Sequence, residues 1–171
     1  MNSRPDPSEY IDLQNKYIKL VPDGNIIDIL TNQQKSILDF LKLINEERSN
    51  YKYAEGKWNV KEVVGHISDS ERIFGYRTLC FSRKDKNPLP GFEQNDFIAN
   101  ANFNNIPFSQ IVEELNSLRT ANILLFKGIS NEMWKLQGMA SNNKITVLAL
   151  AYLIVGHTQH HINVLKEKYG C

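Results

Sequence analysis

Helical periodicity in four separate segments is the feature that most limits how this chain can fold. Apolar residues recur at steps of three, four and seven in residues 26–47, 60–81, 110–128 and 147–169. Steps of this size place the apolar side chains on one face of a helix. Each segment is roughly 20 residues long, which corresponds to about 30 Å of helix. Four helices of similar length, each with one apolar face, predict an all-α four-helix bundle.

Capping residues stand at the expected ends of these segments. Asn25, Asn59 and Thr146 each precede the first periodic residue of a segment, where a side-chain oxygen can accept backbone N–H groups. Ser109 is a possible cap for the third segment. Gly170 follows the fourth segment and can end it in a left-handed conformation.

The links between the segments are the less regular part of the chain. Residues 83–109 contain three prolines and a glycine, and a span of this length can cross the bundle from end to end. The helices that it joins therefore need not be antiparallel neighbours. Short strands are possible here and in residues 128–145, but the alternation of Val, Ile and Thr that is typical of a sheet is missing. We expect one domain spanning residues 1–171, with residues 1–24 as an N-terminal extension that packs on the bundle.

Charge and composition narrow the possible partners and locations. The chain has 20 Lys and Arg residues against 19 Asp and Glu residues, whereas a nucleic-acid-binding protein usually shows a basic surplus. No apolar run reaches the length of a membrane span, and the first residues lack the apolar core of a secretory signal. Cys80 and Cys171 form no C-x-x-C pair. We therefore expect a cytoplasmic protein with reduced thiols that binds neither nucleic acid nor membrane.

Two histidines of the last segment are the strongest candidates for chemistry. His157 and His161 are four residues apart, so both side chains lie on one helix face. Ile154 and Leu165 share that face, which marks it as the core side, whereas His160 falls on a more polar line. Two imidazoles at this spacing can chelate one ion of zinc, nickel, iron or copper. The alternative is a pair of core histidines that are satisfied by hydrogen bonds.

His66 adds a third inward-facing imidazole, on the second segment. It shares its helix face with Val63 and Ile73, so three of the four histidines of the chain face the core. A set of three histidines leaves coordination positions open, as catalytic metal sites do. The residue after His157 is Thr158, so the glutamate that serves as the base in zincins is missing.

The charged residues that follow His66 are weaker candidates. Asp69 stands three residues after His66 and could orient that imidazole, or it could pair with Arg72 on a solvated face. Glu71, Arg72 and Arg77 form a charged cluster, for which a structural ion-pair network is the more common outcome. Arg77 could instead bind a substrate carboxylate, because its planar fork matches that group.

Two stretches resemble the DinB-like superfamily. Residues 56–77, which contain His66, are similar to its second-helix segment, and residues 149–165 are similar to its last helix. The specific part is a single histidine followed, about ninety residues later, by the His-x-x-x-His of His157 and His161. The resemblance covers nearly the whole chain and is closest to the YfiT-like group of metal-dependent hydrolases, which is related to bacillithiol S-transferases.

This resemblance implies an up-down-down-up bundle, frequent homodimers, and one zinc or nickel ion bound by His66, His157 and His161. It favours an enzyme that transfers a low-molecular-weight thiol to an electrophile, or a hydrolase. A bound ion can activate a thiol or a water, and the missing glutamate is consistent with thiol transfer. The rival hypothesis is a non-catalytic, stress-related metal-binding bundle, for which a closed coordination position would be the sign.

Overall fold

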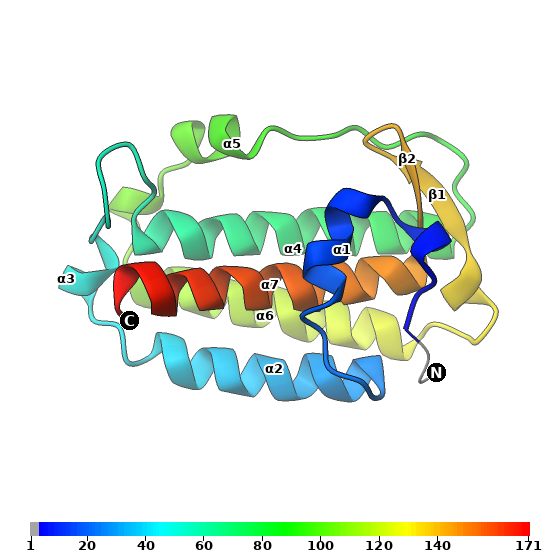
Figure 1. Cartoon of the computed structure of the whole chain (residues 1–171), viewed down its shortest axis with the longest axis horizontal. Helices are drawn as coiled ribbons and strands as arrows, with labels where there is room; N and C mark the ends of the chain where they lie inside the picture. Colours follow the sequence, from blue (N-terminus) through cyan, green and yellow to red (C-terminus); the bar gives the residue numbers. More distant parts are fainter. Residues whose placement is uncertain (1–3) are drawn as a thin grey trace.

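Four long helices lie side by side in the computed structural model, which describes residues 4–171 (Figure 1). They are α2 (Ile26–Leu41), α4 (Val60–Ser82), α6 (Phe108–Lys127) and α7 (Val147–Tyr169). Helix α4 packs against α6 and α7, and α2 packs against the same two helices from the opposite side. The predicted all-α four-helix bundle is therefore confirmed. The first three residues of the expected extension 1–24 lie outside the described part of the chain.

The chain direction alternates in an unusual order. Helices α2 and α7 run one way along the bundle, and α4 and α6 run the other way (Figure 1). This is the up-down-down-up order that the family resemblance implies. The parallel pair α4 and α6 is possible because residues 83–107 return along the whole length of α4. This return contains the short helices α5 (Gln94–Asn100) and η2 (Phe103–Asn105), which both contact α4.

The predicted helix caps are present at three of the four long helices. The side-chain oxygen of Asn25 accepts the backbone N–H groups of the first turn of α2. Asn59 and Thr146 cap α4 and α7 in the same way. These side chains satisfy backbone donors that would otherwise have no partner inside the helix, so they define where each helix begins.

Helices α2 and α6 differ from the boundaries expected for the first and third periodic segments. The segment predicted over residues 26–47 stops at Leu41, and the separate short helix α3 (Glu46–Ser49) follows it, capped by Asn45. Ser109 is not the cap of α6, because that helix already begins at Phe108. The carboxylate of Glu46 accepts the Phe108 N–H at 2.8 Å, so a residue distant in the sequence caps this helix.

The link before α7 contains a β-hairpin that the sequence pattern did not predict. Strands β1 (Gln137–Ala140) and β2 (Asn143–Thr146) pair antiparallel along their whole length. The turn residues Ser141 and Asn142 have φ values of 51° and 61°. Positive φ at both positions is typical of the tight turn whose twist suits a two-residue hairpin. The expectation of no sheet is therefore wrong in this link, because turn geometry rather than strand alternation sets the pairing.

Helix α1 of the N-terminal part of the chain lies across the bundle, near the middle of its long axis. Helix α1 (Asp12–Ile18) packs against α7 and crosses in front of it in Figure 1. Gly156 on α7 permits this contact, because a β-carbon at that position would overlap the backbone carbonyl of Tyr17. The missing side chain of Gly156 thus brings α1 next to the histidines of α7.

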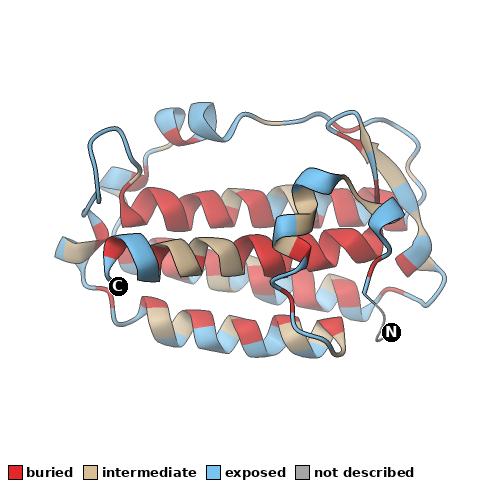
Figure 2. Ribbon diagram, viewed as in Figure 1, coloured by how far each residue is buried: buried red, intermediate tan, exposed pale blue. Residues whose placement is uncertain are grey.

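The bundle has two apolar cores, one at each end. The hairpin-end core is built around Leu30, Phe81, Phe126, Trp134 and Tyr152. The α3-end core is built around Leu41, Ile67, Ile111, Leu115 and Leu165. Figure 2 shows that α4 is buried along most of its length, whereas α2 alternates between buried and exposed positions. A central helix such as α4 must therefore bury polar side chains as well as apolar ones.

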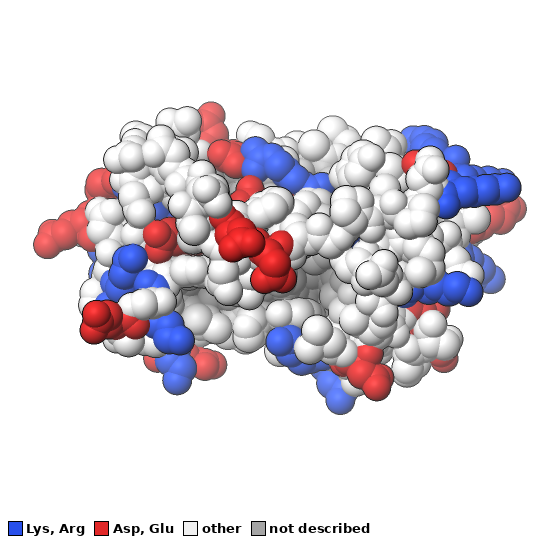
Figure 3. Space-filling view, turned by 90° about the horizontal axis from the view of Figure 1, so that it is seen from above, with Lys and Arg blue, Asp and Glu red and all other residues white. Residues whose placement is uncertain are grey.

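Charged side chains of both signs are interspersed over the face of the molecule drawn in Figure 3. Within residues 4–171, no helix is long and apolar enough to cross a membrane.

Candidate metal centre

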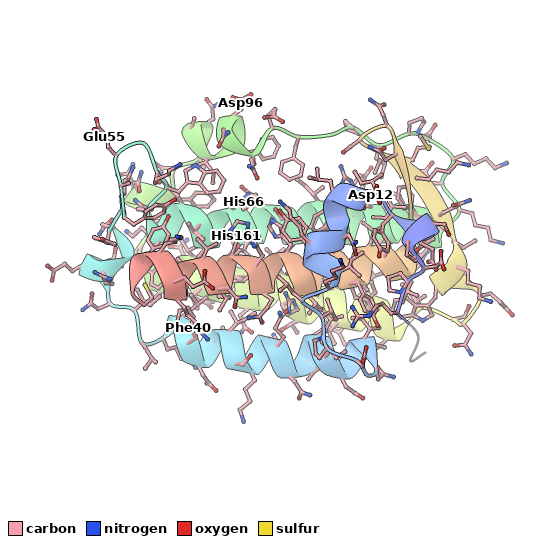
Figure 4. The ribbon with its side chains drawn as sticks, in the orientation of Figure 1. Asp12, Phe40, Glu55, His66, Asp96 and His161 are labelled. Carbon is pink, nitrogen blue, oxygen red and sulfur yellow. The ribbon has the colours of Figure 1, made fainter. Side chains whose placement is uncertain are left out.

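Three histidine side chains from two helices meet between α4 and α7. His66 projects from α4 and His161 from α7 (Figure 4). His157 belongs to the preceding turn of α7. The Nε2 atom of His157 lies 3.1 Å from that of His66 and 3.2 Å from that of His161. One ligand atom from each of the three residues can be chosen so that all lie within 4.8 Å of one another. The structure thus brings together the three histidines that the sequence singled out.

Hydrogen bonds alone do not account for this arrangement. Each Nε2 atom has either one hydrogen or one lone pair, so the Nε2 atom of His157 cannot form a normal hydrogen bond with both neighbours. A shared metal ion does account for it. Two nitrogen ligands bound at 2.0–2.1 Å, at angles between octahedral and tetrahedral, lie about 2.9–3.4 Å apart. The two spacings that involve His157, 3.1 and 3.2 Å, fall in that range, and the ligand atoms of all three residues lie within 4.8 Å of one another. The donor set, three neutral imidazoles, suits a divalent transition metal ion.

Burial keeps these imidazoles neutral. Removal from water lowers the pKa of His66 to about 4. Burial, together with the neighbouring histidines, lowers the pKa of His161 to about 3 and that of His157 well below its usual value. The charged form is disfavoured because little solvent reaches the rings. Neutral imidazole is the form that binds a metal, so protons do not compete for this site near pH 7.

Aromatic rings support the imidazoles from several sides. The Trp58 ring lies 5.0 Å from that of His66. The rings of Tyr17 and Phe74 lie 5.4 Å and 5.9 Å from that of His157, both edge to face. Such contacts limit ring rotation and exclude water from this side of the cluster. Tyr17 belongs to α1, so the N-terminal part of the chain helps to enclose the histidines.

A cavity of about 300 Å³ gives access to the cluster from the side of His161. Its lining includes Lys57, Trp58, Asn95, His160, His161 and Tyr169. This volume is at the small end of the range for ligand pockets. A larger cavity of about 530 Å³ lies between α2 and α6, but no histidine lines it. Of these two cavities, the smaller one therefore reaches the cluster, through His161.

His160 lies beside the cluster but is not part of it. It is half-buried, and its ring is 5.0 Å from that of His161 and 5.3 Å from that of Tyr17. It is not one of the three residues whose ligand atoms converge. The structure therefore places His160 outside the set of three converging histidines.

Asp69 lies one turn after His66 but does not reach an imidazole. Its carboxylate is 3.8 Å from the guanidinium of Arg72, which also pairs with Glu114 at 2.6 Å. Burial raises the pKa of Asp69. Within residues 4–171, the structure gives Asp69 no hydrogen bond to a histidine, so the geometry favours the ion pair over the orienting role.

Arg77 lies far from the histidines along α4. It follows His66 by eleven residues, which is about 16 Å of helix. Its buried guanidinium donates to the Pro90 carbonyl at 2.8 Å and to the Ser141 hydroxyl at 3.0 Å. Arg77 therefore ties α4 to the return segment and to the hairpin, and the structure does not bring it to the cavity beside His161.

Sequence reasoning missed one buried charge, Arg119 on α6. Its guanidinium pairs with Glu71 on α4, with 2.7 Å between Nε and Oε1. Arg119 follows Leu115 by four residues, so its position on the apolar face of the third segment was the available signal. A cation at a core position needs a buried carboxylate partner, but the sequence alone does not show which carboxylate it is.

Comparisons with known proteins agree with this architecture. Among solved structures, YfiT from Bacillus subtilis matches with a TM-score of 0.69 and 17% sequence identity, over 99% of this chain and 94% of that chain. It is described as a probable metal-dependent hydrolase with an unusual four-helix bundle topology. At this identity the likeness establishes the fold, and it accords with the up-down-down-up order seen here.

Two curated relatives are similar in sequence over most of their length. A protein of Oceanobacillus iheyensis is 24% identical over 72% of this chain and 71% of its own. A protein of Geobacillus thermodenitrificans is 23% identical over 74% of each chain. Both are named "Putative metal-dependent hydrolase". The family model of the DinB superfamily matches residues 29–165, which include all three converging histidines, and the chain therefore belongs to the DinB superfamily.

Proposed function

We propose that this protein is a metal-dependent enzyme in which His66, His157 and His161 hold one divalent transition metal ion, either zinc or nickel. The observation that carries the proposal is the convergence of the three imidazoles beside a cavity that His161 lines. Burial keeps these imidazoles neutral, so they leave the positive charge of the ion undiminished. A divalent ion at this site would lower the pKa of a thiol or a water that enters the cavity.

Thiol transfer is the reaction that the site supports best. The converging groups are all imidazoles, and the carboxylate of Asp69 is directed to Arg72 instead. Hydrolysis at such a site usually employs a carboxylate as proton acceptor, whereas a thiolate needs none to attack. In the transfer, a bond forms between the thiol sulfur and an electrophilic carbon. The leaving group departs with the electrons of the broken bond, and the thiol proton passes to solvent through the cavity.

Hydrolysis of a small molecule is the second candidate. The names of the two curated relatives and the description of YfiT support it. A purely structural metal site is a weaker alternative, since structural sites are usually closed by four protein ligands. Here the cavity beside His161 leaves room for a molecule of substrate size.

The proposal implies a small thiol and an electrophile as partners. A homodimer and a cytoplasmic location remain predictions that follow from the family resemblance and from the composition. Light scattering on the purified protein tests the dimer.

The test is a screen of zinc-loaded and nickel-loaded protein with cysteine, glutathione and other biological thiols. The electrophile is a chlorodinitrobenzene, and a nitrophenyl ester without thiol tests hydrolysis. Turnover that needs both metal and thiol, and that is lost in the metal-free protein and in His161→Ala, supports the transferase. Ester hydrolysis alone supports the hydrolase. Absence of both activities from the loaded protein argues against an enzyme.

A further inference from the structure

A buried ion pair lies at mid-height in the bundle, close to the histidines but separate from them. Arg119 on α6 and Glu71 on α4 form two hydrogen bonds, Nε to Oε1 at 2.7 Å and Nη2 to Oε2 at 2.9 Å. Each residue is only 2% exposed. The Asn122 amide also donates to the Glu71 carbonyl at 3.2 Å, and it fits there because Gly75 has no side chain. A two-point pair of this kind fixes direction as well as distance.

The same guanidinium reaches the other two long helices. Its Nη1 donates to the Gln33 side chain of α2 at 2.9 Å, and its Nη2 donates to the Thr158 hydroxyl of α7 at 3.1 Å. The amide of Gln33 in turn donates to the Val155 carbonyl of α7 at 2.9 Å. Arg119 is therefore the centre of a hydrogen-bonded network that contacts all four long helices.

The contacts of this network on α7 and α4 lie close to the histidines. Val155 and Thr158 stand on either side of His157 in the sequence. Glu71 follows His66 by five residues, which is about 7–8 Å along α4. The network thus holds the two histidine-bearing helices near the point where their imidazoles meet.

Metal binding demands more accuracy than apolar packing provides. Ligands must be held to within about 0.5 Å and 10–20° of the correct geometry. A rotation of α7 by 20° would move a side-chain tip, about 5–6 Å from the helix axis, by about 2 Å. Apolar burial is non-directional, so the two cores constrain the rotation of α7 less sharply than hydrogen bonds to defined atoms do. Hydrogen bonds from Arg119 to defined atoms on α7 and α4 can do so.

We infer that Glu71, Arg119 and Thr158 are positioning residues that set the rotation and register of α7 against α4, so that His66, His157 and His161 meet at one ion. This inference rests on the proposed metal site. A buried ion pair is seldom needed for stability, because apolar residues of similar volume often replace it without loss. We expect the pair to act here by positioning the metal ligands rather than by stabilising the fold. An experiment can separate these two roles.

The test replaces the pair with apolar side chains in a double variant, Glu71→Leu with Arg119→Met. A milder variant, Thr158→Val, removes one link to α7 and leaves the ion pair in place. The matched control is Thr78→Val on α4, because Thr78 is fully buried and its hydroxyl is one of the side-chain groups in the described chain that lack a hydrogen-bond partner. Zinc affinity is measured by competition with a chromophoric chelator. The visible spectrum of the cobalt-loaded protein reports the coordination geometry.

We expect the double variant to bind zinc about tenfold more weakly and to show an altered cobalt spectrum, since groups that orient metal ligands typically have effects of this size. Thr158→Val should show a smaller loss in the same direction, and Thr78→Val should match the wild type. Unchanged affinity and spectrum in Thr158→Val and in the folded double variant would overturn the inference. An equal loss in Thr78→Val would also overturn it, because the effect would then be general. A wild-type protein that binds no metal would instead refute the proposed function on which the inference rests.

Discussion

The hairpin-end core and the middle of the bundle are both buried, but they are built from opposite kinds of side chain. Phe126 and Tyr152 at the hairpin end contribute apolar area, whose effect on stability depends little on direction. The middle holds a polar layer, which we define as His66, His157 and His161 with the pair Glu71–Arg119. Polar groups in such a place are favourable only at defined distances and angles. We therefore expect the ends to supply the stability of the fold and the middle to supply the geometry of the site.

The largest effect should come from the hairpin-end core. Phe126 is fully buried and stacks on Trp134 with 5.6 Å between ring centroids. Phe126→Ala should lower the free energy of unfolding by about 3–5 kcal/mol, because it leaves a cavity among close-packed side chains. Urea unfolding of the metal-free protein measures this loss. The zinc affinity of the folded variant should stay at the wild-type value, and a parallel loss of affinity would contradict the division between ends and middle.

Removal of one converging histidine should instead lower the affinity for zinc. His157→Ala or His161→Ala should weaken zinc binding more than about 100-fold, beyond the range for groups that only orient ligands. His160→Ala should bind nearly as well as the wild type, because its ring is outside the cluster. The wild type should contain about one transition metal ion per chain after purification without chelators, as measured by elemental analysis. Equal losses in all three variants would mean that the assigned helical facing is wrong.

The smallest effect for a single side chain concerns the pH dependence of the metal-free protein. The unfolded chain protonates its histidines near pH 6.5, whereas the folded chain keeps His66 neutral to about pH 4 and His161 neutral to about pH 3. The unfolded state therefore binds more protons as the pH falls from 6.5, and the folded state loses stability. Each histidine should contribute about 1 kcal/mol per pH unit below that point. Urea unfolding at pH 7, 6 and 5 tests this. The control variant His66→Asn should show a shallower slope, and a wild-type stability that is constant between pH 7 and 5 would be inconsistent with neutral buried imidazoles.

The long helices and the three histidines could be predicted from the sequence because both depend on local spacing. A helix places residues four apart on one face, so the facing of His157, His161 and His160 follows from numbering alone. Caps such as Asn59 are equally local. Contacts between distant segments have no such signal. The capping of α6 by Glu46 is one example, and the packing of α1 against Gly156 is another.

The charged residues after His66 show the same limit. The sequence places Glu71, Arg72 and Arg77 in one charged cluster, but the structure gives each of them a different partner. Each side chain takes the partner that the neighbouring helix or link offers, and that partner is remote in the chain. Glu71 could be matched with Arg119 only after α4 and α6 were known to run parallel and side by side.

Helical periodicity, caps and the spacing of its histidines are therefore what the sequence by itself determined about this protein. They depend on the backbone geometry of single helices, which is the same in every fold. The tertiary structure alone decided the distances between the Nε2 atoms of His66, His157 and His161, the cavity beside them, and the Glu71–Arg119 network. These features require the rotation and register of one helix against another, which depend on the packing of the whole bundle.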